Sequence, residues 1–204
     1  MYKSFILGVL FLVFLIVLFL ASDMKNAYKI LPGPTSGEMP NPGLFADWRL
    51  FEPASKDFKV DLPAIPQSAK QTVVIPNTDK KRRYEMYASE KMNGSLFMVN
   101  LITYPNDIDT SNHEEIIRGM MDELMLGNPD NHLANFEKTE FKNHEAFNFN
   151  IQNEQYDIQG KAFMVEKVLY LLFYASHQGN FNKADFQHFL DSFSLNPVSL
   201  NNKN

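Results

Sequence analysis

Histidines are the residues of this chain best suited to acid–base or metal chemistry near neutral pH. The five are His113, His132, His144, His177 and His188. None belongs to an HxH pair or an HExxH motif, and the chain has no cysteine that could share a metal with them. Without ligand spacing, each histidine is expected to be exposed or locally hydrogen-bonded. The sequence therefore assigns no metal ligand, and no cofactor or cofactor-binding residue.

Carboxylates and nucleophiles give no catalytic pattern either. Asp122 and Glu123 are adjacent in a predicted helix and point in different directions, unlike a glycosidase pair. Asp107 and Asp109 lack the glycine and the final glutamate of a calcium loop. GxSxG, GxGxxG and GxxxxGK[ST] motifs are all missing from the sequence. No catalytic residue is assigned, and a non-catalytic protein is favoured over an enzyme.

Charge argues against nucleic acid as a partner. The formal net charge is −5, so the chain has no basic footprint for phosphate backbones. Its one basic run is Lys80 to Arg83, which is expected to be a solvated turn or strand edge rather than an anion site.

The most distinctive stretch is Phe5 to Ala21, FILGVLFLVFLIVLFLA, which is apolar on all sides and carries no charge. As a helix it would span about 26 Å, close to the hydrocarbon thickness of a bilayer. A cleaved signal peptide is the alternative. Cleavage after Ala21 or Ser22 would place Phe19 or Leu20 at the −3 position, where signal peptidase prefers small residues. An uncleaved anchor is favoured, with residues 5–21 in the lipid bilayer.

The whole chain divides into four parts. Residues 1–22 are the transmembrane anchor or signal sequence, and residues 23–46 are a Pro/Gly-rich tether. Residues 47–196 are long enough for one globular domain, and residues 197–204 form a disordered tail. A short N-terminal tail before a large C-terminal part favours a single-pass membrane protein with its domain outside the cytoplasm. A secreted or periplasmic protein after signal cleavage is the alternative.

The first half of the domain has the two-residue period of β-strands. Strands are expected at 48–51, 58–62, 71–75, 84–90 and 95–104. Asn93-Gly94 between the last two predicts a hairpin with a type I′ turn. The strand at 95–104 is apolar on both faces, so it should be central and covered on both sides.

The period then changes to that of a helix. Apolar residues at helical spacing fill 116–125, after a capping box formed by Ser111 and Glu114. Further strands are expected at 133–141, 147–151, 156–164 and 165–175. Over 147–152, Asn148, Asn150 and Gln152 alternate with apolar residues, so one face of that strand should meet water. The closing helix should begin at Asn180 or Asn182, end at Pro197, and dock on the VLYLLFYA strand. Its docking residues are Phe186, Phe189, Leu190 and Phe193.

This order predicts an α+β domain, an antiparallel sheet with helices packed on it, preceded by one N-terminal transmembrane helix. The opening DWRLFEP…DFKVDLPAIP, the VLYLLFYA strand and the closing FQHFLDSFSL resemble exported bacterial proteins with a Mog1/PsbP-like α/β/α sandwich. The resemblance covers roughly residues 47–195. Its members are mostly uncharacterised accessory, assembly or binding proteins, and it carries over no catalytic residue.

Together these features predict a membrane-anchored, non-catalytic binding or assembly module outside the cytoplasm. Its expected partners are the lipid bilayer, through residues 5–21, and an unknown protein. A small exported hydrolase or ligand-binding enzyme without a recognisable motif is the alternative.

Overall fold

The computed structural model describes residues 45–75 and 78–196. The predicted anchor or signal over 1–22, most of the predicted tether and the predicted tail lie outside these residues. Within the described chain, no helix is long and apolar enough to cross a membrane.

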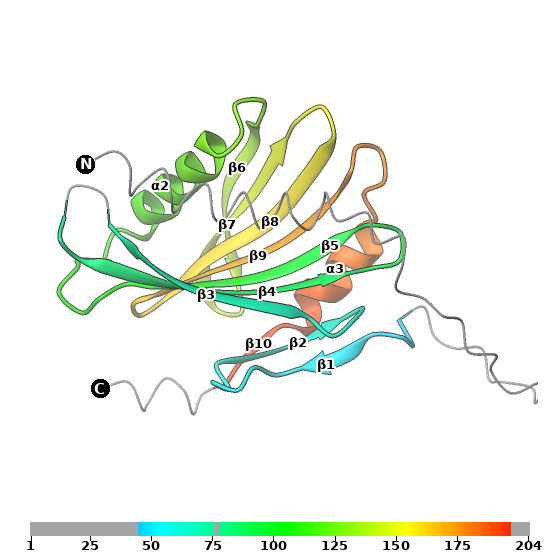
Figure 1. Ribbon diagram of the computed structural model, residues 1–204, viewed down its shortest axis with the longest axis horizontal. Helices are drawn as coiled ribbons and strands as arrows, with labels where there is room; N and C mark the ends of the chain where they lie inside the picture. Colours follow the sequence, from blue (N-terminus) through cyan, green and yellow to red (C-terminus); the bar gives the residue numbers. More distant parts are fainter. Residues whose placement is uncertain (1–44, 76–77, 197–204) are drawn as a thin grey trace, which may run out of the picture.

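A seven-stranded antiparallel sheet forms the centre of the domain, in the order β3-β4-β5-β9-β8-β7-β6 (Figure 1). Its strands are β3 Gln67–Val74, β4 Lys81–Glu90, β5 Leu96–Thr103, β6 His132–Phe141, β7 His144–Gln152, β8 Tyr156–Val165 and β9 Val168–His177. A small sheet of β1 Arg49–Phe51, β2 Phe58–Leu62 and β10 Ser194–Leu195 packs on it, in the order β1-β2-β10.

The two helices lie on opposite faces of the large sheet (Figure 1). Helix α2, His113–Leu126, buries Ile117, Met120, Met121 and Leu124 against one face, which we call the α2 face. Helix α3, Lys183–Ser192, and the small sheet cover part of the other, the α3 face. The predicted antiparallel sheet with two helices is therefore confirmed.

The strand predicted to be central is β5, which pairs with β4 on one side and β9 on the other. All its residues except Thr103 are buried, and β9 is buried from Val168 to Ser176. The two-sided apolarity of these strands follows from their central position, because α2 covers one face and α3 with β2 covers the other.

Both helix starts use an asparagine as the N-cap. Helix α2 begins after Asn112 and not after Ser111, so the predicted capping box is wrong by one residue. The Asn112 side chain accepts from the Glu115 amide at 3.3 Å and donates to the Glu115 carboxylate at 2.8 Å. Asn182 caps α3 as expected, accepting from the amides of Ala184 and Asp185.

The hairpin turns differ from the prediction. Asn93-Gly94 does join β4 to β5, but only Gly94 has a positive φ, of 81°, so the turn is not type I′. The two-residue turn with positive φ at both positions is Lys142-Asn143, between β6 and β7. There Asn143 tolerates the left-handed conformation through its short polar side chain, while Lys142 has no such help.

Helix α3 docks through the predicted aromatic residues. The Phe189 ring lies 5.5 Å from Phe97, and Phe193 lies 6.1 Å from Tyr170 of the VLYLLFYA strand. Pro197 does not end the helix. It ends at Ser192, since Phe193 turns to an extended conformation and inserts among Phe58, Phe163 and Tyr170.

Candidate functional site

The α3 face changes character across the sheet. It is apolar on β5 and β9, where α3 and β2 cover it, and at the end of β6, β7 and β8 marked by Phe141, Ala146 and Phe163; the remaining length of β6, β7 and β8 is polar. We call the polar side chains of this region the polar array. Its members are Asn135, Glu137, Asn148, Asn150, Gln152, Asp157, Gln159, Lys161 and Ser176.

Strand register places these residues in rows that run across the sheet. Gln152, Asp157 and Ser176 are direct neighbours on β7, β8 and β9. Asn135, Asn150 and Gln159 form the next row, and Glu137, Asn148 and Lys161 form the third. Directly opposed side chains on one face lie about 4.5–5.5 Å apart at Cβ, so the array is a continuous hydrogen-bonding surface.

Only part of the hydrogen-bonding capacity of the array is used internally. Lys161 Nζ donates to Asn148 Oδ1 at 2.6 Å, and Gln159 Nε2 donates to Asp157 Oδ2 at 3.3 Å. Burial lowers the pKa of the Lys161 ammonium, because the charged form is less well solvated there.

Three polar atoms of the array are buried without a hydrogen-bond partner among the described residues. They are Asn150 Oδ1, Asp157 Oδ1 and Ser176 Oγ. Ser176 is only 1% exposed. A buried polar group with no partner costs about 1–3 kcal/mol, so such groups are normally satisfied by water or a ligand. The array therefore has hydrogen-bonding capacity that the described residues leave unused.

An aromatic cluster borders the middle row. Tyr174 neighbours Gln159 across β8 and β9, and its ring contacts Phe181 at 5.4 Å and Phe186 at 6.1 Å. Phe181 and Phe186 are half-buried. The array thus passes from amides to partly exposed rings at the edge of α3.

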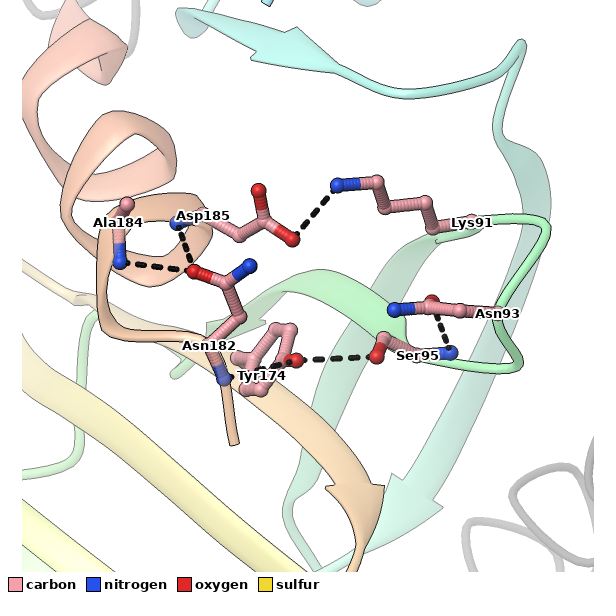
Figure 2. Close-up of polar contacts among 7 residues, drawn as sticks. All are labelled: Lys91, Asn93, Ser95, Tyr174, Asn182, Ala184 and Asp185. Carbon is pink, nitrogen blue, oxygen red and sulfur yellow. Dashed lines mark hydrogen bonds and ion pairs between the residues drawn. The ribbon is translucent and has the colours of Figure 1, made fainter. Parts of the chain in front are cut away.

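Hydrogen bonds and an ion pair hold the start of α3 in place beside the array (Figure 2). Tyr174 Oη lies 2.9 Å from Ser95 Oγ and accepts from the Asn182 amide at 3.4 Å. The buried Asp185 carboxylate pairs with Lys91 Nζ at 2.7 Å. These contacts join the start of α3 to the β4–β5 hairpin. They therefore fix the position of Tyr174 and of the phenylalanine rings that pack on it.

A second polar cluster lies on the α2 face and has a structural explanation. Arg82 is buried and donates to Glu123 Oε1 of α2 at 2.7 Å and to Tyr104 Oη at 3.4 Å. Burial also raises the pKa of Tyr104. The expectation of a fully solvated basic run is wrong at Arg82, since this ion pair closes one end of α2 onto the sheet.

The other residues of the basic run are more exposed. Lys80 pairs with Asp107 at 2.8 Å, and its hydrogen bond lowers the pKa of that carboxyl. Arg83 pairs with Glu85 at 3.2 Å. Lys80 and Arg83 of the basic run, and Asp107 of the sequence compared with a calcium loop, are thus held in ion pairs within the protein.

Asn100 is a further buried polar residue on the α2 face. It is 2% exposed, lies opposite Met86 and Leu171 in the sheet, and neither of its amide atoms has a partner in the described chain. No second group converges on it, so it forms no site by itself.

The five histidines are scattered over the domain. His113 begins α2, His132 begins β6, His144 begins β7, His177 ends β9 and His188 lies within α3. Among the described residues, no three histidine, aspartate or glutamate side chains are grouped to hold a metal ion.

His188 departs from the expectation of an exposed or simply hydrogen-bonded side chain. Its ring stacks on Phe45 at 4.0 Å, meets Trp48 edge-on at 4.9 Å, and its Nε2 lies 3.4 Å from Asp61 Oδ2. It therefore packs the entering chain against α3.

The sequence indicated one strand of the polar array and missed the rest. Alternation predicted that Asn148, Asn150 and Gln152 would face water on β7. Asp157, Gln159 and Lys161 alternate in the same way on β8, and this pattern was the available signal. Ser176 sits in an otherwise apolar strand and had no signal.

Comparisons with known proteins bear on the fold alone. No protein-family model matches the chain, and no curated protein matches it. The solution structure of cyanobacterial PsbP (CyanoP) from Synechocystis sp. PCC 6803 superposes with a TM-score of 0.51 at 10% identity, covering 80% of this chain and 98% of that one. A protein of unknown function from Pseudomonas aeruginosa, PA94, described as a putative regulator, gives a TM-score of 0.33 at 7% identity, covering 69% and 87%. The first of these two structures shows that the domain has a PsbP-like fold.

Proposed function

We propose that this protein is a single-pass, exported bacterial membrane protein whose domain outside the cytoplasm is a non-catalytic binding or assembly module, and that a protein partner docks on the polar array. The observation that carries the proposal is the row-by-row polar array itself, in which Asn150, Asp157 and Ser176 hold polar atoms without a hydrogen-bond partner among the described residues.

The chemistry of the array suits a protein surface. Asparagine and glutamine amides both donate and accept, so they pair with backbone or side-chain amides of a partner in either direction. The half-buried rings of Phe181 and Phe186 supply apolar contact area next to them. A partner that brings donors and acceptors to the half-buried and exposed amides of the array adds hydrogen bonds that the described residues do not make among themselves.

The location rests on residues 5–21 and on the Pro/Gly-rich segment that follows them. Carbonate extraction of membranes tests the anchor, and protease protection tests the side on which the domain lies. The full-length chain should stay in the membrane fraction. Recovery of a soluble protein beginning near Asp23 would establish signal cleavage and contradict the anchor.

Site-specific crosslinking tests the binding face. The chain has no cysteine, so Gln159→Cys can carry a photoactivatable crosslinker in the full-length protein in its native membrane. Arg118→Cys, exposed on the opposite face, is the matched control. We expect a discrete adduct from position 159 that Asn148→Ala combined with Asn150→Ala weakens severalfold. Equal adducts from positions 159 and 118 would contradict docking on the array.

The hydrolase alternative finds no support in the contacts of the array. One row contains His132, Asp157 and Ser176, the residue types of a catalytic triad. Gln152 separates His132 from Asp157 in that row, and Ser176 Oγ has no hydrogen-bond partner in the described chain. No nucleophile–base pair exists there, so we propose no reaction.

A further inference from the structure

The end of the domain where the described chain begins carries two very exposed apolar side chains. Ile65, in the loop between β2 and β3, is 84% exposed, and Met92, at the tip of the β4–β5 hairpin, is 102% exposed. No other large apolar side chain of the described residues is as exposed as these two. Both loops lie at the right-hand end of the domain in Figure 1, together with the start of β1.

Hydrogen bonds fix the β2–β3 loop to strand β4 and brace the β4–β5 hairpin. The Ala64 amide donates to Ser89 Oγ at 3.0 Å, and that hydroxyl donates to the Ala64 carbonyl at 2.8 Å. Within the hairpin, the Lys91 amide donates to the Ser95 carbonyl and the Gly94 amide to the Lys91 carbonyl, both at 2.8 Å. Ile65 and Met92 are therefore displayed on fixed loops, each next to a residue that anchors it.

The entering chain lies at the same end. Lys91 Nζ lies 6.0 Å from the centre of the Trp48 ring, and Trp48 in turn contacts Phe45, the first described residue. Residues 22–44, which separate Phe45 from the apolar span, can extend at most about 80 Å at roughly 3.5 Å per residue. The exposed tips thus lie at the end of the domain where the described chain begins.

We propose that this end of the domain rests on the bilayer, with Ile65 and Met92 inserted into the interfacial layer. The inference rests on the proposed membrane anchor. Two apolar side chains bind a membrane weakly, but a tether makes the contact intramolecular, with an effective concentration on the order of millimolar. The bilayer is the occupant that the anchor brings to these tips, and it gives the domain a defined orientation.

Fluorescence in reconstituted vesicles tests this inference. Met92→Cys in the full-length chain carries an environment-sensitive NBD label, and the vesicles contain phosphatidylcholine with one-quarter phosphatidylglycerol as a chosen composition. Leu126→Cys is the control, because Leu126 is also exposed but ends α2 on the other sheet face. We expect blue-shifted emission at position 92, and quenching by spin-labelled lipids severalfold stronger than at position 126. Adding Ile65→Ser should reduce both signals at position 92.

The outcomes separate this inference from the anchor on which it rests. A chain that floats with the vesicles after carbonate treatment, but whose label at position 92 is as water-exposed as that at 126, keeps the anchor and overturns the tip contact. A blue shift without lipid quenching would mean that a protein surface covers the tips, and would also overturn it. A chain that fails to float overturns both.

Discussion

The two faces of the seven-stranded sheet diverge along β7 and β8, where one backbone carries two different surfaces. On the α2 face, Phe147, Phe149 and Ile151 are buried, and the Phe149 ring lies over Gly160, where an added Cβ would collide with it. On the α3 face, Asn148 and Asn150 alternate with these residues and stay half-buried.

The difference follows from what covers each face. The apolar core of the α2 face spans the sheet from β4 to β7, while the core of the α3 face is concentrated on β5 and β9 and reaches β8 only through Phe163 and Val165. Most side chains of the polar array are half-buried or exposed and keep part of their hydration, whereas apolar side chains in their place would face water. The polar part of the α3 face is therefore compatible with a folded domain in which no helix of the described residues covers it.

Neighbouring substitutions on β7 should show the largest contrast between the faces. Phe149→Ala should lower the free energy of unfolding by about 3–5 kcal/mol, because it leaves a cavity over Gly160. Asn150→Ala should change it by no more than about 1 kcal/mol, since the amide oxygen has no partner to lose. Urea denaturation of the two variants measures both values. Equal losses would mean that the polar array is as much a part of the core as the α2 face.

The ion pair under α2 should give the next largest effect. Arg82→Met leaves the Glu123 carboxylate, whose side chain is 17% exposed, without its partner, and should cost about 3 kcal/mol. The double variant Arg82→Met/Glu123→Leu should recover much of that loss, because no charge then remains buried. Thermal unfolding followed by circular dichroism checks this, and a double variant no better than the single one would contradict it.

On the α3 face, His188 tests how firmly the entering chain is packed. His188→Ala removes the stacking on Phe45 and the contact with Trp48, and should cost about 1–2 kcal/mol. His132→Ala is the control, because His132 is exposed at the start of β6 and should change stability by about 0.5 kcal/mol or less. If the two variants were equally stable, the chain before β1 would not be held by α3.

The smallest effect concerns pH and Lys161. Its folded pKa is lowered by burial, so in alkaline solution the unfolded chain binds more protons at this site than the folded one. Stability then rises with pH between the folded pKa and the ordinary value of about 10.4. Wild type should therefore gain stability relative to Lys161→Met as pH rises through this window. A difference that is constant with pH, in parallel denaturant titrations, would contradict the burial of the ammonium.

The PsbP-like fold was largely predictable because its causes are local. Alternation at period two marks β2, β7 and β8, two-sided apolarity marks β5 and β9, and the helical spacing of the methionines marks α2. The errors fall where two local solutions have similar energies. Asn112 replaces Ser111 as the cap, and the type I′ geometry occurs at Lys142-Asn143 and not at Asn93-Gly94.

By itself the sequence determined which residues form strands and which side of β7 is polar, since side-chain direction follows from the backbone of one strand. Tertiary structure alone decided which residues meet. Arg82 is buried because α2 brings Glu123 to it, and Ser176 joins Asp157 through the register of β8 and β9. Ile65 and Met92 reach one end through the Ala64–Ser89 contact. These pairings join positions far apart in the chain, and no local period encodes them.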